Sequence, residues 1–191
     1  MLTVKILHDY DVEMDDLGWK LRSFNTRHRN FVHPDDIGLN YNTLYVSDSD
    51  LREKFDKGLA FFVSYYEHGN CLWFLANSDT PAGVEFKWDG RKIAGYIEFM
   101  DDENYVPDDI KESAESFLKM YTDYCNGNTY AYAIYDGDEV VDCCGGFIGE
   151  EHLISYLAEM IGDRDFEVIG EYEFFQGEIE DEIALLNSEK K

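Results

Sequence analysis

Three clusters of polar residues in this 191-residue chain have compositions and spacings that could bind a metal ion, bind an anion or provide a catalytic thiol. In the first, His8, Asp9 and Asp11 stand together at the end of an apolar run. Carboxylate oxygens suit Mg²⁺ or Mn²⁺, and imidazole suits transition metals. The chain has 41 acidic residues, so this spacing also arises by chance. The cluster is therefore a candidate metal site, and the alternative is an ordinary polar strand end.

The second cluster is basic, in a chain that is otherwise acidic. Residues 17–34 hold several basic side chains and no carboxylate. Guanidinium groups bind phosphate or carboxylate through paired N–H donors. We therefore expect an anion-binding or intersubunit site formed by Arg22, Arg27, His28 and Arg29. Two other interpretations stay open, namely pairing with carboxylates of the same chain and a solvated basic loop.

The third cluster contains thiols. Cys143 and Cys144 precede two glycines, and His152 follows on the next expected helix. A thiolate near a helix start and an imidazole resembles an activated nucleophile. However, buried cysteine usually acts as a small apolar residue, and the four cysteines form no CxxC pair. We therefore predict no catalytic residue and no cofactor, and we favour a protein that is not an enzyme.

The charge of the chain is concentrated in its second half. The formal net charge is −25, and Glu98–Glu182 alone holds 25 carboxylates against three bases, a charge of −22. Such a segment repels nucleic acid and attracts basic surfaces. We expect a partner-binding acidic surface that contains Asp101, Asp102, Glu103, Asp108, Asp109, Glu171, Glu173, Glu178, Glu180, Asp181 and Glu182.

Composition favours a folded cytoplasmic protein. Hydrophobic residues make up 45% of the chain and aromatic residues 16%, which is ample for a core and argues against an acidic disordered tail. No apolar stretch is long enough to cross a membrane, and acidic residues follow the short N-terminal apolar run at once. We expect one domain over 1–191, with a β-rich half at 1–104 and an acidic half at 105–191 as a subdivision.

The first half is predicted to be rich in strands. Alternating or aromatic runs bounded by turn residues indicate strands, and a capping sequence before residue 50 indicates a short helix. Residues 25–43 are polar and predict a long loop. The expected strands are Leu2–His8, Trp19–Phe24, Leu59–Glu67, Cys71–Ala76, Val84–Trp88 and Ile93–Phe99, the last four as an antiparallel meander, and the expected helix is Asp50–Lys57.

The second half is predicted to run helix, hairpin, helix, strand, helix. Apolar residues at three-to-four spacing mark amphipathic helices, and Asp136-Gly137-Asp138 marks a hairpin turn. The fold class is therefore α+β, with amphipathic helices packed on one face of the sheet. The expected elements are a helix from Pro107 to Asn126, strands Thr129–Tyr135 and Glu139–Cys144, helix Glu150–Ile161, strand Phe166–Phe175 and helix Glu178–Leu186.

Two stretches of the chain resemble a group of uncharacterised proteins encoded by tailed bacteriophages. They are HDYDVEMDDLGWKLRSFNTRHRNFVHPDD at 8–36 and YCNGNTYAYAIYDGDEVVDCCGGFIG at 124–149, together about a third of the chain. That group has an early His/Arg cluster followed by an acid, and a late hairpin ending in Gly-Phe-Gly. It usually has tryptophan before the last glycines, where this chain has Cys143-Cys144-Gly145-Gly146. The resemblance implies a phage or prophage origin and action in the host cytoplasm, and it assigns no residue a role.

Two functional hypotheses follow. The first is an acidic phage-encoded protein that mimics DNA and inhibits a basic, nucleic-acid-binding host factor such as a restriction or CRISPR complex. Such a protein would bind no nucleic acid and no membrane itself, and a homodimer is compatible with it. The alternative is a small-ligand, nucleotide or metal-binding module, or a small enzyme, that uses the His8/Asp9/Asp11 or the Arg27/His28/Arg29 cluster.

Overall fold

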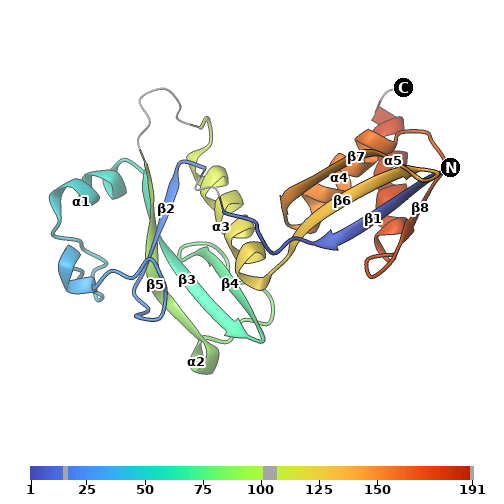
Figure 1. The fold of residues 1–191 in the computed structure, drawn as a ribbon. Helices are drawn as coiled ribbons and strands as arrows, with labels where there is room; N and C mark the ends of the chain where they lie inside the picture. Colours follow the sequence, from blue (N-terminus) through green and yellow to red (C-terminus); the bar gives the residue numbers. More distant parts are fainter. Residues whose placement is uncertain (15–16, 101–106, 190–191) are drawn as a thin grey trace. The chain divides into compact units, whose positions relative to one another are not determined.

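The computed structural model describes residues 1–14, 17–100 and 107–189 (Figure 1). The α+β class is confirmed, since helices accompany two four-stranded sheets. The chain forms two compact units. We call Met1–Met14 with Asp123–Lys191 the terminal unit and Asp15–Thr122 the central unit.

The boundary between these units differs from the expected subdivision at residue 104. The reason is β1 (Leu2–His8), which pairs with strands from the C-terminal part of the chain rather than with its neighbours in sequence. Helix α3 (Ile110–Asn126) contributes to both units. A division by sequence halves could not anticipate such a long-range pairing. The prediction of a single domain stays a prediction.

The terminal unit is built on a sheet in the order β7-β6-β1-β8, in which β1 runs antiparallel to β6 and parallel to β8. Helices α4 and α5 pack on one face of it (Figure 1). Its other elements are β6 (Thr129–Asp136), β7 (Glu139–Ile148), α4 (Glu150–Ile161), β8 (Phe166–Ile169) and α5 (Phe175–Glu189).

Alternation along β1 explains which face of this sheet is covered. Leu2, Val4 and Ile6 are buried, whereas Lys5 between them is exposed. Successive side chains of a strand point to opposite faces, so the even-numbered residues face the helices. There they join a core that also contains Tyr130, Tyr132, Ile134, Leu153, Leu157, Ala158, Ile161, Val168, Phe175 and Ile179.

The predicted order of the second half is confirmed, but several boundaries differ. β7 runs to Ile148 rather than Cys144, and α5 spans Phe175–Glu189 rather than Glu178–Leu186. The strand expected over Phe166–Phe175 ends at Ile169, because Gly170 adopts a left-handed backbone (φ +95°). Phe175 instead begins α5, and its fully buried ring belongs to the core. An aromatic residue gives the same pattern in a strand as in a buried helix, so the sequence did not separate the two.

The central unit has a sheet in the order β2-β5-β3-β4, with all neighbours antiparallel. Helix α3 packs on one face, where the indole N–H of Trp19 donates to the Ser113 hydroxyl (3.0 Å). The remaining elements are β2 (Trp19–Ser23), the 3₁₀-helix η1 (Pro34–Ile37), α1 (Ser49–Asp56), β3 (Ala60–His68), β4 (Asn70–Leu75), α2 (Phe86–Asp89) and β5 (Gly90–Phe99).

A second apolar cluster lies on the other face of this sheet. Ala60 and Tyr96 come from strands of the sheet, and Ile37 comes from η1 and Leu51 from α1. Phe24 and Val46, which lie outside these elements, complete the buried cluster. The segment expected to be one long loop therefore contains η1, whose Ile37 is buried in this cluster. The central sheet thus has helical segments on both faces.

The meander predicted in this unit is wrong in one respect. The Val84–Trp88 run forms no strand, and α2 takes up its second part. The periodicity of a short apolar run does not distinguish one helical turn from a strand. Here the Phe86 ring packs on Phe74, with the ring centroids 6.0 Å apart. The long connection lets β5 return beside β3, on the side away from β4.

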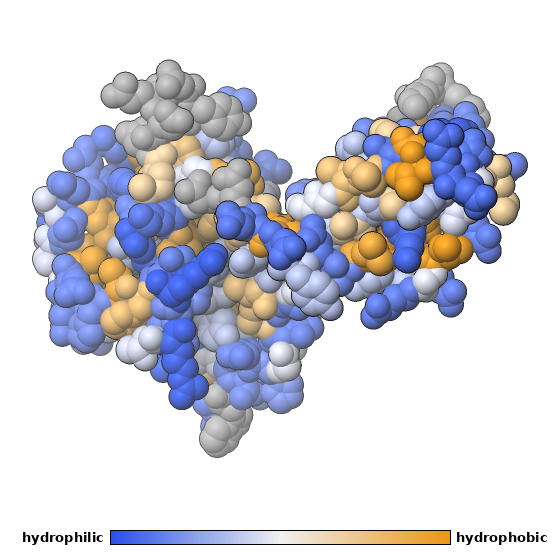
Figure 2. All heavy atoms as spheres, viewed as in Figure 1, coloured by the Kyte–Doolittle hydropathy of each residue, from blue (hydrophilic) through white to orange (hydrophobic). Residues whose placement is uncertain are grey.

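The surface of the described residues is mixed in character. On the face shown in Figure 2, hydrophilic residues (blue) are interspersed with hydrophobic ones (orange) over both units. None of the helices within the described ranges combines the length and the apolar character needed to cross a bilayer.

Candidate functional site

The first predicted cluster is used for local structure. The Asp9 carboxylate accepts hydrogen bonds from the backbone N–H of Asp11 (3.1 Å) and of Gly146 (2.9 Å), which ties the end of β1 to β7. The His8 ring contacts the edge of Tyr10 (4.2 Å between centroids). Across residues 1–14, 17–100 and 107–189, no three His, Cys, Asp or Glu side chains form a group that could hold a metal ion.

The second predicted cluster is divided between the two faces of the central sheet. Arg22 lies on the face of Tyr96, with its Nε 3.6 Å from the Glu98 carboxylate. Lys54 of α1 binds the same carboxylate at 2.8 Å. His28 lies on the opposite face, against Trp73 (5.6 Å between ring centroids). Arg22 and His28 therefore cannot contribute to one anion site.

The loop after β2 displays Arg27 and Arg29 on the surface and turns His28 inward. The Arg27 backbone N–H donates to the Asn25 side chain (3.0 Å), and the Asn30 backbone N–H donates to His28 Nδ1 (3.2 Å). These bonds explain the loop without a bound anion. An intersubunit role for the two arginines stays a prediction.

The imidazole of His28 is held in its neutral form. Burial is the main cause that lowers its pKa, and the charge of Arg29 adds to the effect. Since Nδ1 accepts from Asn30, the proton of the neutral ring is on Nε2, which lies 2.6 Å from the Tyr121 hydroxyl oxygen. His28 therefore fastens the loop to α3.

The predicted acidic surface is shared between the two units. Asp101, Asp102 and Glu103 lie outside the described residues. Asp108 and Asp109 belong to the central unit, where Asp109 accepts a hydrogen bond from the Glu112 backbone N–H at the start of α3 (2.9 Å). The remaining residues of that surface are in the terminal unit, namely Glu171, Glu173, Glu178, Glu180, Asp181 and Glu182.

The terminal unit carries most of the charge. Its 83 residues include 21 carboxylates and four basic side chains, a formal charge of −17, which leaves −8 for the central unit. The Arg164 guanidinium donates to the backbone carbonyl of Ile161 (2.9 Å) rather than to a carboxylate. Four exposed carboxylates, Glu171, Glu173, Glu178 and Asp181, form no ion pair with any residue that the structure describes.

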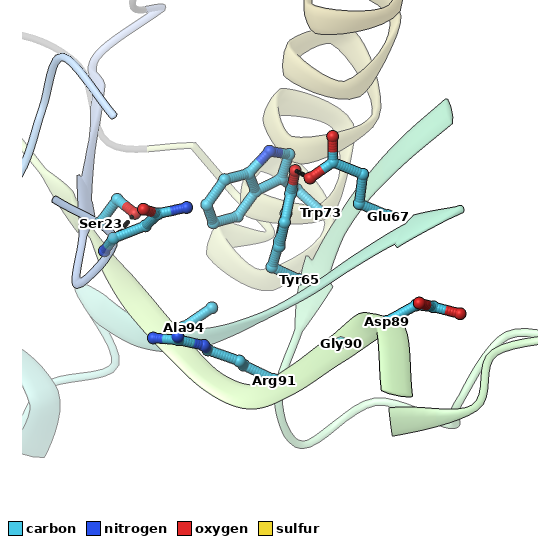
Figure 3. Close-up of a pocket in the computed structure, with 9 residues that line it drawn as sticks. Ser23, Tyr65, Glu67, Trp73, Asp89, Gly90, Arg91 and Ala94 are labelled. Atoms are coloured by element: carbon cyan, nitrogen blue, oxygen red, sulfur yellow. Dashed lines mark hydrogen bonds between the residues drawn. The ribbon is translucent and has the colours of Figure 1, made fainter. Parts of the chain in front are cut away.

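The central unit contains a cavity of about 320 Å³ that the sequence did not indicate (Figure 3). Its lining includes Trp73 and Tyr65 of the β3–β4 hairpin and the exposed, charged Glu67, Asp89 and Arg91. In the sequence, Asp89-Gly90-Arg91 predicted only a hairpin turn. No local pattern identified these residues, because the pairing of β3 with both β4 and β5 brings them together.

Comparison with known proteins gives no relative from which a function could be transferred, because no family model, no curated protein and no solved structure matches the chain.

Proposed function

We propose that this chain is an acidic interaction protein whose terminal unit binds a basic, nucleic-acid-handling protein of a host cell. The observation that carries the proposal is the formal charge of −17 on the 83 residues of that unit. The negative electrostatic potential of exposed carboxylates is not neutralised where no basic side chain pairs with them. This potential attracts a positively charged surface and speeds association with it.

The proposed mode of action is competition with nucleic acid. Duplex DNA presents about one negative charge per 1.7 Å of its axis, and DNA-binding proteins neutralise these charges with lysine and arginine side chains. Carboxylates spaced along α5 and the turn before it would occupy the same basic groove. Binding there excludes DNA and inhibits the partner, as expected of an anti-restriction or anti-CRISPR protein that a bacteriophage encodes and that acts in the host cytoplasm.

The alternative hypothesis has weaker support at the residues first assigned to it. Asp9 binds backbone N–H groups, and His28 binds the loop and Tyr121. Both side chains therefore have structural roles. A ligand-binding role for the central unit is favoured by a different observation, the cavity beside Trp73.

The experiment is a pull-down from bacterial lysate treated with nuclease, with the full chain immobilised. Because salt screens charge–charge attraction, a basic partner recovered at about 50 mM salt should be lost at about 200 mM. The recovered partner is then bound to a labelled DNA duplex and titrated with the chain, which should displace the DNA. Recovery of no basic nucleic-acid-binding protein, or a partner that holds DNA and the chain together, would contradict the proposal.

A further inference from the structure

The middle of the cavity in the central unit is an aromatic wall. Trp73 is 4% exposed, and its ring centroid lies 4.5 Å from that of the half-buried Tyr65. Cavities of this size hold small ligands, and flat apolar walls with a few polar groups are typical of their binding sites. The half-buried Tyr65 ring, backed by Trp73, can therefore pack against the hydrocarbon part of a ligand.

An irregularity in β5 makes the space in front of this wall. Val63 pairs with Gly95 and Tyr65 pairs with Arg91, so β5 has two more residues than β3 between these pairs. Ile93 consequently packs in the cluster on the other face of the sheet, and the small Ala94 lines the cavity. Bulges of this kind redirect side chains and are frequent beside binding sites.

One end of the cavity presents hydrogen-bond donors. Ser23 is fully buried, and its hydroxyl accepts from the Asn25 backbone N–H (3.0 Å) while donating to no described residue. The Arg91 guanidinium forms no ion pair or hydrogen bond with any described residue, and the same holds for the amide N–H₂ of Asn25. Three donors without protein acceptors suit a carboxylate, which guanidinium binds in paired fashion.

The other end presents carboxylates. Glu67 accepts a hydrogen bond from the Tyr65 hydroxyl (2.6 Å), and Asp89 lies 3.1 Å from Nδ1 of His68. In Figure 3 these two carboxylates lie on one side of the Trp73 ring, and Ser23 and the guanidinium of Arg91 lie on the other. Each carboxylate has further lone pairs that could accept from an ammonium group.

We propose that this cavity binds a small zwitterion of the amino-acid class. The carboxylate of the ligand binds Arg91 and Asn25, its ammonium group binds Glu67 and Asp89, and its side chain packs on Trp73 and Tyr65. A singly charged ligand would leave one end of the cavity without a counter-charge. This inference is independent of the proposed function, since it concerns the central unit and a small molecule.

Calorimetric titration of the full chain with three matched probes tests the proposal. L-Phenylalanine carries both charges, L-phenylalaninamide lacks the carboxylate, and 3-phenylpropionate lacks the ammonium group. We expect phenylalanine to bind with a millimolar or lower Kd and each analogue to bind at least about tenfold more weakly, the effect of one charge-assisted hydrogen bond. Equal affinity for all three probes, or no binding of phenylalanine at millimolar concentration, would overturn it.

Variants assign the two ends of the cavity separately. Arg91→Gln should weaken phenylalanine about tenfold and leave phenylalaninamide unchanged, whereas Glu67→Gln should weaken phenylalanine and leave 3-phenylpropionate unchanged. Both side chains are exposed, so the fold should persist, and circular dichroism checks this. Lys92→Gln is the control, because Lys92 is an exposed neighbour whose Nζ lies 5.8 Å over the Phe86 ring, outside the cavity. An equal loss in Arg91→Gln and Lys92→Gln would refute the assignment.

Discussion

The Nε2 atom of His28 lies 2.6 Å from the hydroxyl oxygen of Tyr121, and this contact holds the loop after β2 against α3. The Asn30 backbone N–H donates to the other ring nitrogen, so a protonated ring would lose that bond and present two N–H groups where one is used. The arrangement makes the stability of the central unit depend on the protonation of one histidine.

The first prediction concerns pH. Burial and Arg29 depress the pKa of His28 in the folded chain, so folding favours the neutral ring. The stability from this site is therefore fully present above the unfolded pKa of about 6.5 and is lost as pH falls through the lower folded value. Thermal unfolding of the wild type should show this loss as the pH falls below about 6.5.

Comparison of two variants isolates that effect from the titration of carboxylates. His28→Gln removes the titrating group and should make the fall in stability below pH 6.5 shallower than in the wild type. His152→Gln changes an exposed histidine of the terminal unit and should keep the wild-type slope. If all three proteins show the same slope, His28 is not held neutral by the fold.

The second prediction concerns the close approach of β2 and β5. A Cβ at Gly95 would overlap the backbone carbonyl oxygen of Arg22, and backbone cannot move aside as a side chain can. Gly95→Ala should destabilise the central unit by about 3 kcal/mol. Gly177→Ala in α5 has open space around it and should stabilise the terminal unit by about 0.5–1 kcal/mol, the helix propensity gain. Denaturant titration measures both, and an unchanged Gly95→Ala midpoint would show that the strands are not this close.

The third prediction separates a structural Asp9 from a metal ligand. Its carboxylate binds the backbone of Asp11 and Gly146, so Asp9→Ala should cost about 1 kcal/mol of stability, whereas Asp11→Ala should be nearly neutral. Mg²⁺ or Mn²⁺ should leave the melting temperature of the wild type unchanged. A metal-induced rise that both substitutions abolish would restore the metal-site hypothesis.

The fourth prediction concerns Glu98, whose side chain is 16% exposed and faces both Arg22 and Lys54. Glu98→Gln removes the shared counter-charge from two half-buried cations and should cost about 1–3 kcal/mol, less than for a fully buried pair because solvent still screens the site. Glu53→Gln breaks an exposed pair with Lys57 and should give no measurable change in the unfolding midpoint. Equal midpoints for the two variants would show that Glu98 contributes no more than a surface pair.

Elements with a strong local pattern were predictable from the sequence. The alternation in β1 and the three-to-four spacing in α4 arise because each element buries one face. Both elements have the bounds expected from the sequence. The strand expected at Val84–Trp88 and the extension of β8 to Phe175 failed where aromatic residues pack in a helix instead of a strand. In both places tertiary packing overrode a short local signal.

The sites were less predictable than the elements. Arg22 and His28 are six residues apart, yet they lie on opposite faces of the sheet. β2 ends at Ser23, and the loop after it carries His28 to the face of Trp73 and Tyr121. Arg91 and Ser23 line one cavity although 68 positions separate them, because β2 pairs with β5 and places Ser23 opposite Gly95 of that strand. The net charge, by contrast, could be predicted without the fold, because the excess of carboxylates is counted directly from the sequence.

The most direct test of the proposed function compares two variants with equal net charge. One replaces Glu171, Glu173 and Glu178 with Gln and Asp181 with Asn in the terminal unit, and the other replaces Asp36, Asp50, Asp56 and Asp79 with Asn in the central unit, all eight being exposed. Capture of a basic nucleic-acid-binding protein from lysate at low salt is then measured for each. We expect the terminal-unit variant to lose the partner and the central-unit variant to retain it. Equal retention, or loss only in the central-unit variant, would contradict the claim that the terminal unit is the binding surface.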